Sequence, residues 1–242
     1  MHRSAKRLTG LLACAAVPVM LVAGCSDSDK KDAGPEASKT AAPSSSKGGG
    51  NGSSAPGVAP AKYKKLPDPC AAVSKDTIKK LLPKAEDEAG TRGKSSDASA
   101  RGYCSWKSSD NQGLKGTQYR WMDIRFHRYD SDPTVGSGDK RATDFYNSQI
   151  DTAKGTPNAK NVKTSKADGV GDEATSVTYD LKKDDNDFKN QTVVSRLNNV
   201  VVTLNFNGSG LAGAKAPDRD EMLKDAQNAA KEAVAAVAKA NR

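Results

Sequence analysis

The sequence predicts an α+β fold: an antiparallel sheet of about five strands with helices packed on one face, preceded by a disordered tether. Alternating apolar residues and helical periodicity occur in the order helix, two strands, helix, three strands, helix. A stretch rich in Ser, Gly, Ala and Pro comes before them and lacks the apolar residues of a core. We therefore divide the 242-residue chain into a signal peptide (1–24), a lipidated tether (25–61) and one extracytoplasmic domain (62–242).

The first 24 residues are typical of a bacterial lipoprotein signal peptide. Basic residues without an acid precede the uncharged residues 8–23, a run shorter than the ~20 apolar residues of a membrane-spanning helix. The run closes with Leu21–Cys25, which resembles the lipobox, in which the cysteine receives diacylglycerol. An ordinary secretory peptide containing a cysteine is the alternative. We expect Cys25 to carry lipid, including palmitate, that holds the protein on the extracytoplasmic face of the cell membrane.

Residues 26–61 are expected to be a flexible tether. They contain no aromatic residue, and Val58 is their only branched aliphatic residue. A coil of this length has a mean reach of roughly 30 to 36 Å. Whether its serines carry O-linked sugar is left open.

Residues 62–242 are long enough for one domain with a sizeable core. The whole chain has a net charge of +9, and loss of the three basic residues of the signal peptide leaves +6. Nucleic acid is not an expected partner outside the cell. A mildly basic surface favours an anionic envelope polymer or lipid head groups, although it is also typical of a well-solvated surface. Another envelope protein is the further partner that we consider.

The cysteines predict one disulfide bond. Cys14 leaves with the signal peptide and Cys25 carries lipid, so Cys70 and Cys104 remain in an oxidising compartment. A bond between them would close a loop of about 35 residues and stabilise the domain by roughly 3 to 4 kcal/mol. Two free thiols or half a metal site are the alternatives. His127 is the only histidine of the mature chain and no further cysteine is available, so we expect no zinc site. We also expect no other metal and no cofactor.

A short helix and a strand are predicted first in the domain. Ser74 can cap the helix, and residues 86–101 are expected to form a loop. In the strand 103–108, Cys104 and Trp106 share a face, which would place the disulfide beside a buried indole.

A longer strand, residues 117–129, has two unlike faces. Met122, Ile124 and Phe126 should face the core. The opposite face carries Tyr119, Trp121, Asp123, Arg125 and His127.

The second half of the domain is predicted to hold a helix, three strands and a final helix. The helix covers residues 140–154, and the strands cover 177–181, 192–197 and 200–206, with an acidic turn at 184–187. Asn198 and Asn199 tolerate the positive φ of a tight hairpin turn. Asp218 can cap the final helix, whose narrow Ala-rich stripe suggests close packing against the sheet.

The candidate binding face consists of Tyr119, Trp121, Arg125 and His127. The pattern behind it is an interleaving of aromatic and positive side chains, as on a polymer-binding face, by Tyr119, Arg120, Trp121, Arg125, Arg128 and Tyr129. An ordinary amphipathic strand is the alternative interpretation.

A hydrolase would use His127 as a base oriented by Asp123. No nucleophile stands out, and G-x-S-x-G and H-E-x-x-H are both absent, so we expect an exposed strand histidine and name no catalytic residue. Residues 169–174 fit G-x-G-x-x-A without the strand before and helix after that a dinucleotide site needs, and they are interpreted as a turn. Residues 184–187 lack the spacing of a calcium loop.

Four short motifs resemble actinobacterial lipoproteins grouped as domain of unknown function 3558. They are Asp68-Pro69-Cys70, Cys104-Ser105-Trp106, Gly169-Val170-Gly171-Asp172-Glu173-Ala174 and Val200-Val201-Val202-Thr203. The resemblance implies a paired Cys70 and Cys104 and an α+β envelope domain. It implies no established activity and no catalytic residues. The charge-rich turn 182–189 departs from the family pattern.

The leading hypothesis is a non-enzymatic, membrane-anchored lipoprotein whose domain binds a ligand or a partner in the cell envelope. An enzyme acting on envelope material and a structural or accessory subunit are the alternatives.

Overall fold

The computed structural model describes residues 57–242. The predicted signal peptide, Cys25 and residues 26–56 of the predicted tether lie outside the described residues. The last residues of that tether contact the domain. Ala61 is buried, and the carbonyl of Ala59 accepts a hydrogen bond of 2.6 Å from the Ser131 hydroxyl. Packing against the domain therefore begins before residue 62.

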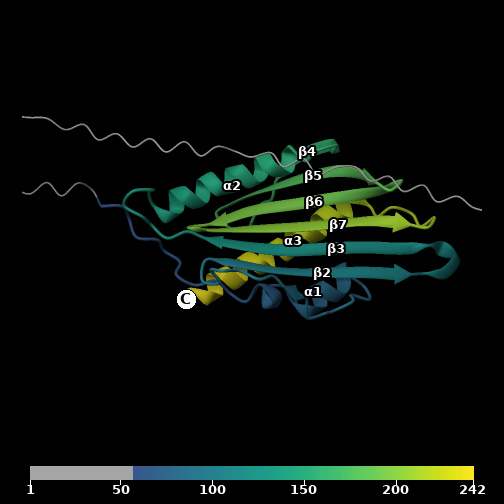
Figure 1. The fold of residues 1–242 in the computed structure, drawn as a ribbon, viewed down its shortest axis with the longest axis horizontal. Helices are drawn as coiled ribbons and strands as arrows, with labels where there is room; N and C mark the ends of the chain where they lie inside the picture. The colour runs from purple at the N-terminus through teal and green to yellow at the C-terminus, as the bar shows by residue number, and fades with distance from the viewer. Residues whose placement is uncertain (1–56) are drawn as a thin grey trace, which may run out of the picture. The chain divides into compact units, whose positions relative to one another are not determined.

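A seven-stranded antiparallel sheet forms the centre of the domain, with strand order β1-β2-β3-β7-β6-β5-β4 (Figure 1). The strands are β1 (Thr91–Arg92), β2 (Arg101–Asn111), β3 (Thr117–Arg128), β4 (Lys160–Lys166), β5 (Glu173–Lys183), β6 (Asn186–Leu197) and β7 (Val200–Leu211). The α+β class is confirmed. The expected count of about five strands was too low.

The two strands missing from the prediction are those at the edges of the sheet. β1 has two residues and lies in the segment 86–101 that was expected to be a loop. All residues of β4 are exposed, and Val162 is its only apolar one, so no alternating pattern marks it. Lysines along an exposed edge oppose pairing with another chain.

Three helices and two short 3₁₀ helices complete the described part. They are α1 (Lys75–Leu81), α2 (Gly138–Lys154), α3 (Arg219–Ala240), η1 (Pro69–Ala71) and η2 (Gly113–Lys115). The caps expected from the sequence are present. The Ser74 hydroxyl accepts from the Thr77 amide at 3.2 Å, and the Asp218 carboxylate accepts from the Glu221 amide at 2.9 Å.

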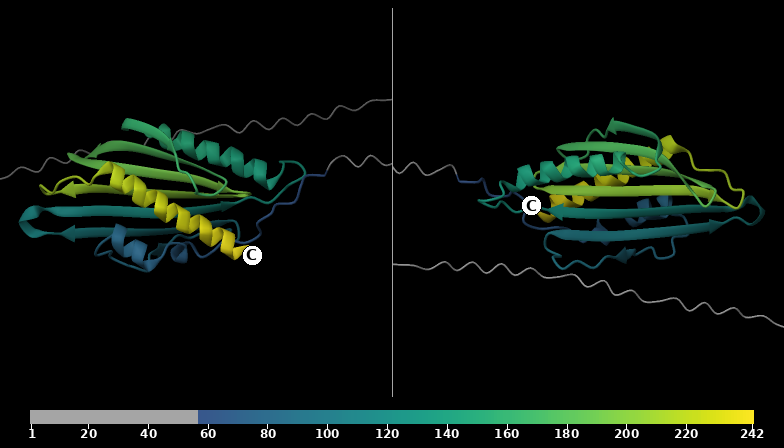
Figure 2. Two further views of the ribbon diagram at one scale, coloured as in Figure 1. Left: turned by 180° about the vertical axis from the view of Figure 1, so that it is seen from behind. Right: turned by 45° about the horizontal axis from the view of Figure 1, so that its top comes forward.

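The helices lie on both faces of the sheet, so the expectation of one covered face was wrong (Figures 1 and 2). On β6, Val193 belongs to the core cluster that contains α3, whereas the next residue, Val194, packs with Ala142 and Tyr146 of α2. Consecutive residues of a strand point to opposite faces. The unbroken β-branched runs of β6 and β7 therefore indicate strands with both faces covered at this point.

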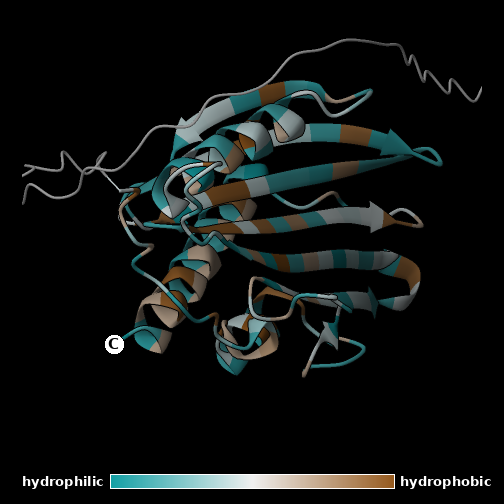
Figure 3. Ribbon diagram, turned by 60° about the vertical axis from the view of Figure 1, so that its left-hand side comes forward, coloured by the Kyte–Doolittle hydropathy of each residue, from teal (hydrophilic) through white to brown (hydrophobic). Residues whose placement is uncertain are grey.

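The larger core lies between the sheet and α3. Met122, Ile124 and Phe126 are 0% exposed there, as the alternation along β3 predicts. Ala226, Ala229, Ala230 and Ala233 of α3 are also 0% exposed, and the ribbon of α3 alternates between hydrophilic and hydrophobic colours in Figure 3. Small side chains let the helix axis approach the strands closely, so the Ala-rich stripe packs as predicted.

A disulfide bond joins Cys70, in η1, to Cys104 of β2. Trp106 is buried beside it and donates from its indole nitrogen to the Glu88 carbonyl at 3.3 Å. Gly90 lies against both groups with φ +79°, and a Cβ there would come within 2.6 Å of the Cys104 sulfur and the indole. The N-terminal segment is thus held against the sheet edge by a covalent bond and a close backbone contact.

The described chain begins and ends at the same end of the sheet. The Asn199 side chain, in the β6–β7 turn, accepts from the Tyr63 amide at 2.8 Å and donates to the Tyr63 carbonyl at 2.9 Å. Asn241 accepts in the same way from the amides of Lys64 and Lys65. The β2–β3 hairpin and the β5–β6 turn lie at the opposite end (Figure 1). Within residues 57–242, no helix is long and apolar enough to cross a membrane.

Candidate functional site

Helix α2 covers only part of its face of the sheet. It packs over Val194 and Val201, and its Tyr146 hydroxyl lies 2.7 Å from the Thr175 hydroxyl. Beyond these positions the same face continues toward the β5–β6 turn with aromatic and amide side chains that line surface hollows.

Strand register places these side chains in rows across four strands. One row, from β3 through β7 and β6 to β5, consists of Trp121, Asn207, Asn190 and Tyr179. The next row toward the β5–β6 turn consists of Tyr119, Ser209, Phe188 and Leu181. Side chains directly opposite each other on neighbouring strands are close enough to act together on one ligand.

Two adjoining hollows lie over these rows. One has a volume of about 210 Å³ and the other about 450 Å³, and both are lined by Asn190 and Asn207. We call the combined depression the open groove. It is lined by Tyr119, Trp121, Arg125, Tyr179, Leu181, Phe188, Asn190, Asn205 and Asn207.

A hydrogen-bonded chain of polar side chains fixes one wall of the open groove. The Thr192 hydroxyl donates to the Asn205 side-chain oxygen at 2.8 Å, and the Asn205 amide donates to both oxygens of Asp123 at 3.3 and 3.2 Å. Arg125 donates from Nε to Asp123 at 2.9 Å. Residues that are held in this way keep one orientation before any ligand arrives.

Asp123 is a carboxyl group with a fully buried side chain in the middle of this chain. Burial raises the pKa of Asp123 above its ordinary value, although Arg125 and Asn205 oppose that shift. The Arg125 side chain is 46% exposed, and its guanidinium carbon lies 5.4 Å from the centre of the Tyr103 ring. Only Nε of Arg125 is bonded to Asp123, so its two terminal nitrogens can donate to a ligand.

Several polar groups in the open groove have no hydrogen-bond partner within residues 57–242. They include the indole nitrogen of Trp121 and the amide group of Asn207, whereas the Asn190 amide nitrogen donates to the Phe188 carbonyl at 3.1 Å. Phe188 and Tyr119 meet edge to face at 5.9 Å between ring centres and form an apolar end to the groove. The open groove thus combines aromatic surfaces with free donors and acceptors.

Three of the four predicted binding residues line the open groove. Tyr119, Trp121 and Arg125 do so, whereas His127 lies beneath α2 with its ring centre 4.5 Å from that of Phe145. The expectation of an exposed histidine was wrong, because α2 covers this end of the face. Burial and the nearby Arg101 and Arg125 lower the pKa of His127 to about 4.

The pair required by the hydrolase alternative is not formed. Asp123 accepts hydrogen bonds from Arg125 and Asn205, and Nδ1 of His127 is buried without a partner among the described residues. A base oriented by a carboxylate needs a hydrogen bond between the two groups.

Sequence reasoning missed the other half of the open groove: Tyr179, Asn190, Asn205 and Asn207. Asparagine is depleted in strands, so three asparagines at alternate or facing positions of β6 and β7 were a usable signal. Their convergence on Trp121 depends on the pairing of β3 with β7, which skips three strands in the chain.

The remaining sequence motifs are turns in the structure. Gly169 and Gly171 adopt positive φ just before β5, as expected for a turn that enters a strand. Asp184 and Asp185 also adopt positive φ and connect β5 to β6. Within residues 57–242, no group of three or more His, Cys, Asp or Glu side chains is arranged to hold a metal ion.

Comparisons with known proteins do not assign this chain to a family. No protein-family model matches the chain, and no curated protein matches it. The resemblance to domain of unknown function 3558 is therefore not confirmed. The crystal structure of LpqN, described as involved in cell envelope biogenesis of Mycobacterium tuberculosis, matches with 17% identity and a TM-score of 0.30 over 63% of this chain and 78% of that chain. A similarity this low supports no inference about function.

Proposed function

We propose that this protein is an envelope-anchored binding protein and that its open groove holds a segment of glycan. The observation that carries the proposal is the row formed by Trp121, Asn207, Asn190 and Tyr179 across four adjacent strands. It puts an aromatic side chain at each end and two amide side chains between them on one rigid surface.

This combination matches the chemistry of sugars. The C–H face of a pyranose ring packs against an aromatic ring, while its hydroxyl groups both donate and accept hydrogen bonds. The Asn207 amide offers the same double capacity, whereas the Asn190 amide nitrogen donates to the Phe188 carbonyl and leaves its oxygen as the acceptor. The Arg125 guanidinium donates to oxygen in a planar fork. The Asp123 carboxylate holds Arg125 and Asn205 in place at the groove wall.

The position of the open groove suits a tethered protein. Leu181, Asp184 and Asn186 of the β5–β6 end line it, and the described chain enters at the opposite end, beside Asn199. With lipid on Cys25, the tether would join the domain near Ala59, at the end of the sheet opposite the open groove. Membership of the lipoprotein family named above is part of this proposal.

Binding to envelope polymer tests the proposal. The mature chain, residues 25–242, is prepared with Cys25→Ala so that it carries no lipid. It is then mixed with protease-treated, delipidated envelope polymer from the bacterium that makes the protein. We expect retention that is lost when the polymer's vicinal diols are oxidised with periodate.

Substitutions connect that retention to the groove. Trp121→Ala with Asn207→Ala should release the protein, because the stacking surface and a free amide are both removed. Val162→Thr, on the exposed edge strand β4, is the matched control and should be retained. No retention of the parent chain, or retention that survives the double substitution, would rule out glycan binding in this groove. Retention that survives periodate treatment would show that the bound sugars lack vicinal diols.

A further inference from the structure

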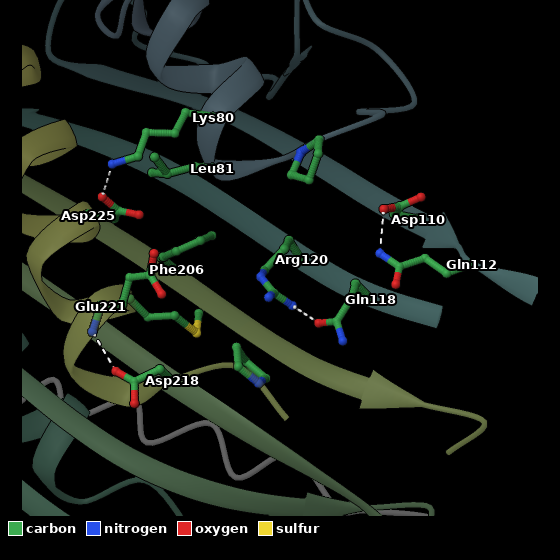
Figure 4. Close-up of a pocket in the computed structure, with 13 residues that line it drawn as sticks. Lys80, Leu81, Asp110, Gln112, Gln118, Arg120, Phe206, Asp218, Glu221 and Asp225 are labelled. Carbon is green, nitrogen blue, oxygen red and sulfur yellow. Dashed lines mark hydrogen bonds and ion pairs between the residues drawn. The ribbon is translucent and has the colours of Figure 1, made fainter. Parts of the chain in front are cut away.

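A second pocket, on the α3 side of the sheet, differs from the open groove in its charges. It lies between α1, strands β2 and β3, and the start of α3, with a volume of about 250 Å³ (Figure 4). Leu81, Phe206 and Met222 contribute apolar surface. The charged side chains that line it are Lys80, Asp110, Arg120, Asp218, Glu221 and Asp225.

Arg120 is the central positive group of this pocket. Its Nη1 donates to the Gln118 side chain at 3.0 Å and to the Tyr119 carbonyl at 2.8 Å. The side chain lies across Gly208 of β7, where a Cβ atom would be 2.8 Å from the Arg120 Cδ. The absence of a side chain at Gly208 therefore lets the guanidinium lie along the strand and into the pocket.

Arg120 forms no ion pair within residues 57–242, although four carboxylates line the same pocket. Its side chain is half-buried, and this burial lowers the pKa of Arg120, although the nearby Glu221 carboxylate opposes that shift. Removing a guanidinium from water without a carboxylate partner is unfavourable. A ligand carboxylate would supply the missing partner through two parallel hydrogen bonds.

Two of the four carboxylates are also without a cation. Asp225 pairs with Lys80 at 2.6 Å and Asp110 pairs with Lys84 at 2.5 Å. Glu221 and Asp218 pair with no lysine or arginine in the described part of the chain, and Asp218 caps α3. The pocket thus holds the half-buried Arg120 and the exposed Glu221 and Asp218 with no salt bridge between them, although Glu221 lies close enough to Arg120 to act on its pKa.

We propose that this pocket binds a small zwitterion, an amino acid or a short peptide, with its carboxylate on Arg120 and its ammonium group on Glu221 and Asp218. A simple anion would leave the acids unpaired, and a simple cation would leave Arg120 unpaired. The side chain of the ligand would pack against Phe206 and Met222. This site is separate from the open groove and does not depend on glycan binding.

Titration of the ¹⁵N-labelled mature chain carrying Cys25→Ala tests the proposal. The probes are alanine and leucine in both enantiomers and the dipeptides alanyl-alanine and alanyl-leucine. We expect saturable shifts at the backbone amides of Arg120, Gly208 and Glu221. Leucinamide, which lacks the carboxylate, and N-acetylleucine, which lacks the ammonium group, should bind at least about tenfold more weakly than leucine. Whether amino acids or dipeptides bind more tightly identifies which of the two is the ligand.

Variants connect the binding to the unpaired charges. Arg120→Gln and Glu221→Gln should each weaken binding by about tenfold or more. Gly208→Ala should do the same in a folded protein by displacing Arg120. Arg101→Gln, which changes an exposed arginine of β2, is the matched control and should bind normally. The proposal fails if no probe shifts these amides, if the blocked analogues bind as tightly as leucine, or if the exposed Glu221→Gln variant binds like the parent.

Discussion

The two faces of strand β3 have different roles in the same molecule. On one face, Met122, Ile124 and Phe126 are 0% exposed and pack in the core with α3. On the other face, Trp121 and Arg125 line the open groove. A strand that is fixed on one side by a close-packed core can present ligand-binding groups on the other side with little motion. Stability and recognition are thus separated by the alternation of a single strand.

The largest loss of stability should follow a substitution on the face of β3 that packs against α3. Ile124→Ala should lower the free energy of unfolding by about 2 to 5 kcal/mol, because it leaves a cavity beside α3. Trp121→Ala, three positions earlier and on the groove face, should lower it by less than about 1 kcal/mol. Urea denaturation of both variants measures the difference. Equal losses would mean that the groove face is a second core, and the comparison between the faces would be wrong.

The second largest loss of stability should follow removal of the disulfide bond. Replacing Cys70 and Cys104 together by Ser should cost roughly 2 to 4 kcal/mol, because the unfolded chain gains the freedom of a loop that spans 34 positions. Thermal unfolding of this variant, with the reduced parent as control, measures the cost. Since Cys104 faces the core on the α3 side of the sheet, opposite to the open groove, retention on envelope polymer should not change. A folded variant that was no longer retained would show that the open groove depends on the disulfide, and would contradict the separation between the two faces of the sheet.

A smaller, pH-dependent change in the free energy of unfolding should come from His127, which lies beneath α2 on the groove side of the sheet. The pKa of His127 is lowered to about 4, so the unfolded chain binds a proton below its ordinary pKa of 6.5 while the folded chain does not. Protonation of the unfolded chain therefore destabilises the folded state as the pH falls from 6.5 toward 4, whereas above pH 6.5 the histidine is neutral in both states. Relative to a His127→Phe variant, the parent should lose roughly 1 to 2 kcal/mol between pH 7 and pH 4.5, with allowance for partial exposure. Parallel pH profiles in urea denaturation would show that α2 does not bury this histidine.

The sequence predicted the elements whose pattern is local. The alternation along β3, the caps at Ser74 and Asp218, and the Asn198–Asn199 turn depend on neighbouring residues, and each is present. β4 was missed because an exposed edge strand of lysines and polar residues has no alternation to detect. The placement of helices on both faces was missed because Val193 and Val194 read as one apolar run.

The candidate site was predictable only along one strand. Tyr119, Trp121 and Arg125 share a face of β3 by simple alternation, whereas Asn190 and Asn207 join them only through the register of β3, β7 and β6. His127 shares the same alternation, but α2 covers it, and a helix that packs from a distant part of the chain leaves no mark on the strand's own sequence.

Amide chemical-shift mapping of the mature chain with soluble glycan fragments released from the envelope polymer tests the central claim most directly. The account predicts saturable shifts confined to the rows of Trp121 and Tyr119 across β3, β7, β6 and β5, with no shift at Met122, Ile124 or Phe126. Absence of shifts, or shifts centred elsewhere on the domain, would contradict the assignment of recognition to the open face of the sheet.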